Sequence, residues 1–151
     1  WSTQSGRAKA CARRTARLLG SRCGVTVTST PATTTHACDR QKDKKVSLSY
    51  GCTFDDYGAT NFLNFSRTNN DGHGNKLIVM FVSTTGDGEQ CDSIRDTWNA
   101  LLHKSLPANL YQNTNFALFC LGDRAYGPTA FCAAGRKLAA RLVQLGATSY
   151  C

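Results

Sequence analysis

The stretch that decides the fold is LIVMFVSTTGDGE, residues 77–89. Its first six residues form an unbroken apolar run, which is typical of a parallel strand that is buried on both faces of a sheet. The remainder contains two glycines and predicts a tight turn where that strand ends. A second unit follows, in which FALFCL (116–121) predicts another buried strand and GDRAYGPTA (122–130) predicts a loop after it.

Each of these loops leads into a predicted helix. The first helix is CDSIRDTWNALLHK (91–104), and the second is FCAAGRKLAARLVQL (131–145), which Gly146 closes. The apolar face of the first helix is predicted to hold Ile94, Trp98, Leu101 and Leu102. An alternation of strand, loop and helix indicates an α/β domain with a central parallel sheet.

The beginning of the chain predicts another helix. Small and apolar residues recur with helical spacing from Ala8 to Leu19, and arginines occupy the other face. A loop that opens a helix in such a sheet should follow a strand, so we expect the first strand upstream of residue 1. Residues 28–45 are polar and aperiodic, which indicates a surface insertion or a disordered segment. A further strand is predicted at 46–53, with VTV (25–27) as the alternative.

Length, charge and cysteine content limit the possible functions. The 151 residues fit one domain, and no apolar run approaches the roughly 18 residues that a membrane span needs. The formal charge of +8 suits an acidic partner, a nucleic acid or a polyanionic cofactor, but no RNA-binding or zinc-finger signature accompanies it. Nucleic acid is therefore not favoured. The eight cysteines lack metal-binding spacing and indicate reduced thiols, with Cys11 and Cys120 acting as small hydrophobic residues.

Three loops are expected to meet at the carboxyl edge of the sheet, where ligands of such folds bind. They are residues 2–8, 83–89 and 122–130. In the first loop, STQSGRA, the hydroxyls of Thr3 and Ser5 precede a helix N-terminus, which favours a phosphate group. An ordinary Ser/Thr helix cap is the alternative reading of that loop. The glycine turn and a loop tyrosine, Tyr126, add a backbone wall and a ring that can stack on a flat ligand.

In their order and spacing, these motifs resemble the FMN-binding, flavodoxin-like domain of the diflavin reductase family. The resemblance covers residues 1–23 and 77–148, and it implies a three-layer sandwich around a five-stranded parallel sheet. Residues 1–151 would then form a single domain with an insertion at about 28–45. STTGDGE and KSLP (104–107) are more similar to the diflavin oxidoreductases of cytosolic iron–sulfur assembly than to P450 reductases.

The resemblance assigns FMN-binding roles to three groups of residues. The residues that match the phosphate loop are Thr3, Gln4, Ser5, Gly6, Arg7 and Ala8. Those that match the loop along the flavin ring are Thr84, Thr85, Gly86 and Gly88. The third loop contributes Leu121, Gly122, Asp123 and the ring partner Tyr126, followed by Phe131 and Cys132.

Some positions depart from the family pattern. Ser2 stands where glycine is usual, Thr85 stands where P450 reductases carry a stacking tyrosine, and Cys132 replaces an asparagine that often contacts the flavin. The net charge is basic, whereas relatives typically dock their partners through acidic residues. Four acids, Asp87, Glu89, Asp92 and Asp96, nevertheless form a local group near the expected cleft.

The function that the resemblance implies is electron transfer. The chain would pass electrons from an FAD/NADPH reductase domain in cis, beyond Cys151, to an anamorsin-type iron–sulfur protein in the cytoplasm. FMN would carry out the redox chemistry, and no catalytic side chain or metal is expected. The chain alone is not expected to oxidise NADPH. The alternatives are a free-standing flavodoxin and a flavodoxin-like binding module that has lost FMN.

Overall fold

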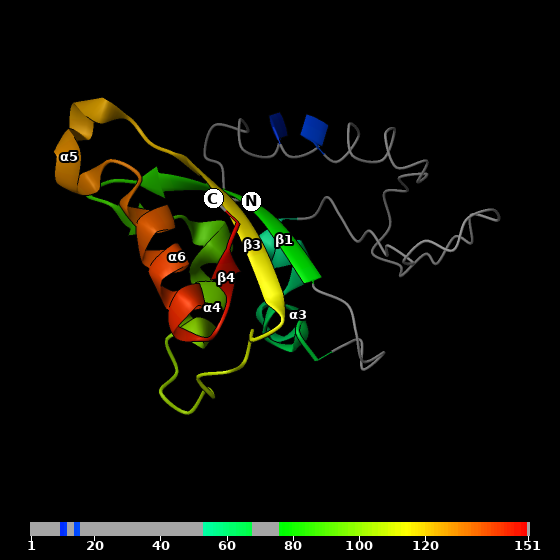
Figure 1. The fold of residues 1–151 in the computed structure, drawn as a ribbon. Coiled ribbons are helices and arrows are strands. Elements are labelled where there is room, and N and C mark those ends of the chain that lie inside the picture. The colour runs from blue at the N-terminus through cyan, green and yellow to red at the C-terminus, as the bar shows by residue number, and fades with distance from the viewer. Residues whose placement is uncertain (1–9, 12–13, 16–52, 68–75, 151) are drawn as a thin grey trace.

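Two parallel strands, β1 (Lys76–Thr85) and β3 (Thr114–Leu121), form the centre of the fold (Figure 1). The structure is a computed structural model, and it describes residues 10–11, 14–15, 53–67 and 76–150. Both strands are paired without interruption from Lys76 opposite Thr114 to Ser83 opposite Leu121. The two strands predicted from apolar runs are therefore confirmed, and each is longer than its apolar run.

The sheet contains two further short strands, in the order β2-β1-β3-β4. β4 (Thr148–Ser149) is parallel to β3, whereas β2 (Glu89–Gln90) is antiparallel to β1. The antiparallel pair was not predicted; it arises because the turn at residues 86–88 reverses the chain before the next helix. Other predicted strands, upstream of residue 1 and at 25–27 and 46–52, lie outside the described residues.

The helices that follow the two loops are confirmed as α4 (Asp92–Leu101) and α6 (Ala133–Gln144). Both lie on the same side of the sheet (Figure 1). Gly146 closes α6 with a φ of +91°, which favours glycine. The assignment of Leu102 to the buried face of α4 was wrong, because this residue caps the helix and is about half exposed, whereas Thr97 is buried in the face.

The loop after β3 is more regular than predicted. It holds a short 3-10 helix, η1 (Arg124–Tyr126), and one turn of helix, α5 (Gly127–Ala130). Asp123 caps the first of these, because its Oδ1 atom accepts a hydrogen bond of 2.9 Å from the backbone N–H of Ala125. Both short helices lie beyond the ends of β1 and β3 (Figure 1).

Two short helices precede β1, namely α2 (Phe54–Tyr57) and α3 (Ala59–Asn64). Thr53 caps α2 through a capping box, in which its hydroxyl accepts from Asp56 N at 3.1 Å and its own N–H donates to the Asp56 carboxylate at 3.3 Å. Thr53 is thus a helix cap and not the last residue of a strand, as the predicted strand at 46–53 required.

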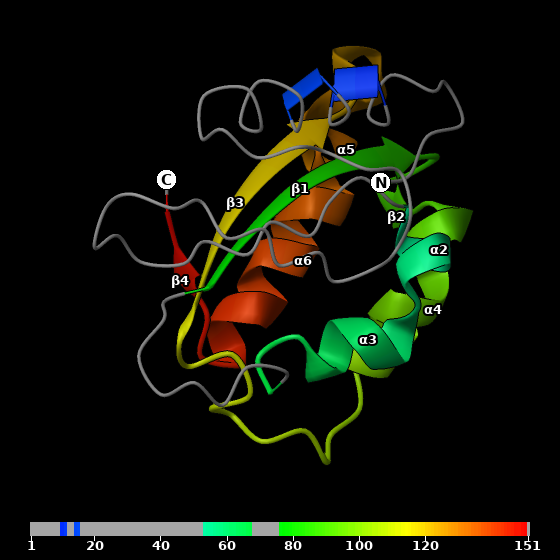
Figure 2. The same ribbon diagram turned by 90° about the vertical axis from the view of Figure 1, so that its right-hand side faces the viewer.

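The main core fills the space between the sheet and α2, α3, α4 and α6 (Figure 2). Its fully buried side chains include Val82, Ile94, Tyr111 and Leu138. The opposite face of β1 and β3 carries a smaller cluster, in which Phe81 is buried and stacks on Phe119 with ring centroids 4.8 Å apart. Among the described residues this face stays partly open, since Leu77 and Phe119 are 51% and 49% exposed. The predicted burial was therefore wrong for Leu77 in the first strand and for Phe119 in the second.

Four residues of the predicted helix from Ala8 to Leu19 are described, and they are helical: Ala10, Cys11, Arg14 and Thr15. The Thr15 hydroxyl donates a hydrogen bond of 3.0 Å to the carbonyl of Cys11. The Cys11 side chain is exposed, which does not fit the predicted role of a small hydrophobic residue. The interval 28–45 lies outside the described residues.

Candidate functional site

Two of the three loops that were expected to form the site lie against each other. They follow the same sheet edge, because Ser83, two residues before the end of β1, is paired with Leu121, the last residue of β3. The contact itself is close: a Cβ atom placed on Gly88 would lie 3.4 Å from Ala130 Cα and 2.9 Å from Ala133 Cβ. The third loop, which carries Thr3, Gln4, Ser5, Gly6, Arg7 and Ala8, lies outside the described residues.

The turn of the β1–β2 hairpin has two different glycines. Gly86 is exposed and adopts a φ of +47°, and a Cβ placed on it would meet no atom of the described residues within 4 Å. Gly88 adopts a φ of +98° and is buried against the start of α6. The backbone at Gly86 is therefore open at the sheet edge, whereas Gly88 packs the turn against the N-terminal end of α6.

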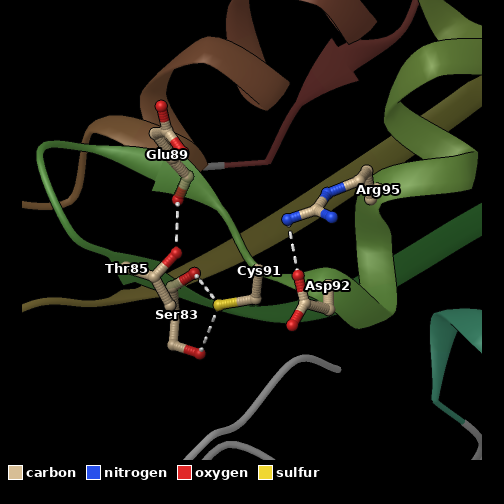
Figure 3. Close-up of polar contacts among 6 residues, drawn as sticks. All are labelled: Ser83, Thr85, Glu89, Cys91, Asp92 and Arg95. Carbon is tan, nitrogen blue, oxygen red and sulfur yellow. Dashed lines mark hydrogen bonds and ion pairs between the residues drawn. The ribbon is translucent and has the colours of Figure 1, made fainter.

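Hydrogen bonds hold the strands on either side of this turn (Figure 3). The Thr85 hydroxyl donates to Glu89 O at 3.4 Å, and Gly88 N donates to Thr85 O at 3.2 Å. The buried thiol of Cys91 donates to Ser83 O at 3.1 Å. Thr84 differs from these residues, because its buried hydroxyl oxygen has no hydrogen-bond partner among the described residues.

The loop after β3 exposes the predicted ring partner. Tyr126 is 61% exposed, and Gly122 and Asp123 are also exposed. Leu121 is partly buried beside Phe81. Phe131 is partly buried, and the Arg124 guanidinium lies over its ring at 5.7 Å from the centroid.

Cys132 lies where this loop enters α6. It has a φ of +55°, the only positive φ among the described residues that are not glycine. It is also close to Gly122, because a Cβ on that glycine would lie 2.8 Å from Cys132 N and 3.2 Å from its sulfur. Burial raises the pKa of the neighbouring thiol of Cys120, as does the proximity of Cys132, while Arg136 opposes the shift.

The described part of the site fits a flavin ring. Among the described residues, an exposed tyrosine, an open glycine turn and a threonine hydroxyl without a hydrogen-bond partner belong to the two loops at this sheet edge. A flat ligand could stack on Tyr126, lie against the backbone at Gly86 and hydrogen-bond to polar groups of the turn. The arrangement can therefore hold a flat aromatic ligand.

Charge is distributed unevenly along the chain. Residues 1–52 hold ten Lys and Arg against two Asp and Glu, and residues 53–151 hold eight of each. The domain as a whole is basic, as interpreted, and the excess of positive charge lies in its first 52 residues. Near the turn, Asp87, Glu89, Asp92 and Asp96 are all exposed, and Asp92 forms an exposed ion pair of 2.5 Å with Arg95 (Figure 3).

Other features of the described residues do not belong to this site. An open hollow of about 470 Å³ lies at the end of α4 that is farther from the turn, lined by Asn99, Leu102, His103, Lys104 and Ser105. No group of three His, Cys, Asp or Glu side chains in the described ranges could hold a metal ion. None of the described helices is long and apolar enough to cross a membrane.

The chain belongs to the flavodoxin family, whose model matches residues 53–151. This confirms the predicted flavodoxin-like α/β fold.

Within that class, the chain is similar to proteins named NADPH-dependent diflavin oxidoreductase 1. The protein from Dictyostelium discoideum is 45% identical over 73 residues, which are 48% of this chain and 11% of that protein. The protein from Cryptococcus neoformans is 43% identical over 72 residues, or 48% and 11% of the two chains. The protein from Arabidopsis thaliana is 40% identical over 77 residues, or 51% and 12%. The predicted resemblance to diflavin reductases is thereby confirmed, over a small part of these relatives' length.

Sequence reasoning missed the contacts between the turn and α6. Lys137 Nζ donates to Gly88 O at 3.1 Å, and Gln90 Nε2 donates to Ala134 O at 2.9 Å. Lys137 lies on a polar helix face, and Gln90 is one polar residue in a polar stretch. Nothing in the sequence therefore distinguishes either residue as a contact between the turn and α6. Only the packing of α6 against the hairpin brings them into contact.

Proposed function

We propose that this chain binds FMN and transfers electrons as the flavodoxin-like domain of an NADPH-dependent diflavin oxidoreductase. One observation carries the proposal: the Gly86 turn and the Tyr126 loop meet at the carboxyl edge of the parallel sheet and leave a ring and a backbone surface exposed. Ligands of open α/β sheets bind at this edge. The names of the similar proteins support the same class of reaction.

The residues of the chain would position the cofactor rather than react with it. Tyr126 would stack on the flavin ring, the turn at Gly86 would lie along its edge, and residues 3–8 would hold the phosphate at a helix N-terminus. FMN, once bound, supplies one- and two-electron redox chemistry. The exposed acids around the turn would disfavour added negative charge on the ring by repulsion.

The electron path belongs to this proposal as well. Electrons would arrive from an FAD/NADPH reductase domain in cis and leave to an anamorsin-type iron–sulfur protein in cytosolic iron–sulfur cluster assembly. In the absence of that reductase domain, the 151-residue chain should not oxidise NADPH. A free-standing flavodoxin remains the alternative carrier, and a reading frame that continues into an FAD/NADPH module would distinguish the two.

The decisive experiment is an FMN titration of the 151-residue chain, followed by flavin fluorescence and absorbance. We expect binding with one FMN per chain and the yellow colour of a flavoprotein. Tyr126→Leu should weaken binding about two- to twelvefold, because the loss of one aromatic stacking contact removes roughly 0.5–1.5 kcal/mol. The matched control is Tyr150→Leu, which removes an exposed tyrosine near the C-terminal end of the chain and should bind FMN as the unmodified chain does.

The outcomes separate the proposed function from its rivals. A folded chain that binds no FMN would contradict the proposal and favour a flavodoxin-like binding module. Equal losses of affinity in the two tyrosine variants would leave the flavin assignment in place and remove Tyr126 from the site.

A further inference from the structure

The turn between β1 and β2 contacts α6 through one close packing approach and two hydrogen bonds. The first is steric: Gly88 approaches so closely that a Cβ would lie 2.9 Å from Ala133 Cβ. The second is the hydrogen bond from Lys137 Nζ to Gly88 O, at 3.1 Å, which acts within the turn. The third is the bond from Gln90 Nε2 to Ala134 O, at 2.9 Å, which acts directly after it.

Gln90 is an unusual residue to find in this position. It is only 9% exposed, and among the described residues its Oε1 atom is buried without a hydrogen-bond partner. A buried, unsatisfied amide oxygen destabilises a fold, and a leucine of similar size would avoid that cost. The bond to Ala134 O adds little to α6, whose backbone carbonyls already accept helical hydrogen bonds. What this bond does provide is a fixed distance between the hairpin and the first turn of α6.

We propose that Gln90 and Lys137 are positioning residues, which clamp the Gly86–Gly88 turn on α6 and thereby tune the reduction potential of FMN. The inference rests on the proposed function. It concerns residues that touch the turn and not the reacting atoms.

The physical reason lies in the freedom of Gly86. A glycine at φ +47° with open space around it can exchange between backbone conformations at little steric cost. Each conformation presents either a carbonyl oxygen or an N–H to whatever lies at the sheet edge. A flavin changes its protonation when it is reduced, so the orientation of that peptide group affects its potential. A turn that is held at Gly88 and Gln90 has fewer conformations to exchange between.

The test compares four variants of the 151-residue chain. Gln90→Leu and Lys137→Met each remove one clamp bond and keep the apolar bulk. Lys137→Arg keeps the charge and a donor. Lys104→Met removes an exposed lysine just beyond the C-terminal end of α4, away from the turn, and serves as the charge-matched control.

Two properties are measured. The first, in FMN-free protein, is hydrogen exchange of the Gly88 amide, which donates to Thr85 O across the turn. The loss of one hydrogen bond should accelerate exchange about fivefold in Gln90→Leu and in Lys137→Met. The second is the pair of midpoint potentials of bound FMN, which should shift in the same direction in both variants. Lys137→Arg and Lys104→Met should resemble the unmodified chain in both properties.

Three results would overturn the inference. Unchanged exchange in Gln90→Leu and Lys137→Met would show that neither bond restrains the turn. A potential shift in Lys137→Met alone would reduce the effect to the lost positive charge, since Gln90 is neutral. If the unmodified chain binds no FMN, the proposed function and the tuning role both fail, whereas faster exchange would still identify the clamp.

Discussion

Tyr111 shows how a single side chain ties distant parts of this chain together. Its ring is fully buried, its hydroxyl donates to Phe62 O at 2.9 Å, and the two rings lie edge to face with centroids 6.0 Å apart. Burial, and secondarily the nearby Tyr57, raise the pKa of the Tyr111 hydroxyl well above its ordinary value of 10.0. The folded state therefore favours the neutral phenol.

This pKa shift predicts a specific loss of stability in alkali. Above about pH 10 the tyrosine ionises in the unfolded chain and stays protonated in the folded one, so rising pH lowers the free energy of the unfolded state relative to the folded state. We expect the free energy of unfolding to fall by up to about 1.4 kcal/mol per pH unit from this residue.

Tyr111→Phe isolates the effect. It should cost about 1 kcal/mol at pH 7, through the lost hydrogen bond, and should lose stability less steeply above pH 10 than the unmodified chain. Denaturant titrations at both pH values measure this difference. Burial also lowers the pKa of Lys76. Because both proteins contain this lysine, its contribution cancels in the difference between their stabilities. Parallel alkaline slopes in the two proteins would contradict the prediction.

At the scale of elements, the approach of β3 to α6 depends on a small residue in the helix. A Cβ on Gly135 would overlap the sulfur of Cys120 and lie 3.2 Å from its Cβ. Glycine is otherwise unfavourable inside a helix by roughly 1 kcal/mol relative to alanine. The close contact between strand and helix thus outweighs helix propensity at this position.

A double-mutant cycle tests this packing. Gly135→Ala should lower the free energy of unfolding by about 1–2 kcal/mol, because overpacking outweighs the gain in helix propensity. In a Cys120→Ala background, which removes the overlapping sulfur, Gly135→Ala should be neutral or stabilising, with a coupling energy of about 1–2 kcal/mol. Thermal and denaturant unfolding of the four proteins gives the cycle. Additive effects would mean that the two residues do not compete for space.

At the scale of the whole molecule, the net charge belongs to one part of the chain. The excess of +8 lies in residues 1–52, and residues 53–151 are neutral overall. The segment that the flavodoxin model matches is thus not the basic part. Binding of a polyanion and binding of a flavin are therefore expected to depend on different residues.

Heparin chromatography provides the check. Replacing Lys42, Lys44 and Lys45 by glutamine should lower the salt concentration at which the chain elutes. Each positive side chain that binds heparin releases counterions from it, so each one lost weakens binding. Replacing Arg67, Lys104 and Arg124 by glutamine removes the same charge from the neutral part and should change elution much less. Equal shifts would show that only total charge governs the interaction. FMN affinity should be unchanged by the first set of substitutions.

The sequence by itself determined the framework. Two apolar runs became β1 and β3, two amphipathic stretches became α4 and α6, and the glycine-containing loops after the strands marked one sheet edge, because hydrophobic periodicity and glycine act locally. The reliance on local patterns also explains where the sequence-based predictions were wrong. Leu102 fits the helical period of α4, yet it lies at the helix end, where the described part of the chain leaves it about half exposed.

Only the tertiary structure decided how the turn is held. The antiparallel strand β2 has two residues, too few for a periodic signal. The contacts of Gly88 with Ala133, of Lys137 with Gly88 and of Gln90 with Ala134 join positions more than forty residues apart. Nothing in the sequence near either partner specifies such a contact, because it depends on the register of a helix against a hairpin. That register is fixed by the packing of the core as a whole.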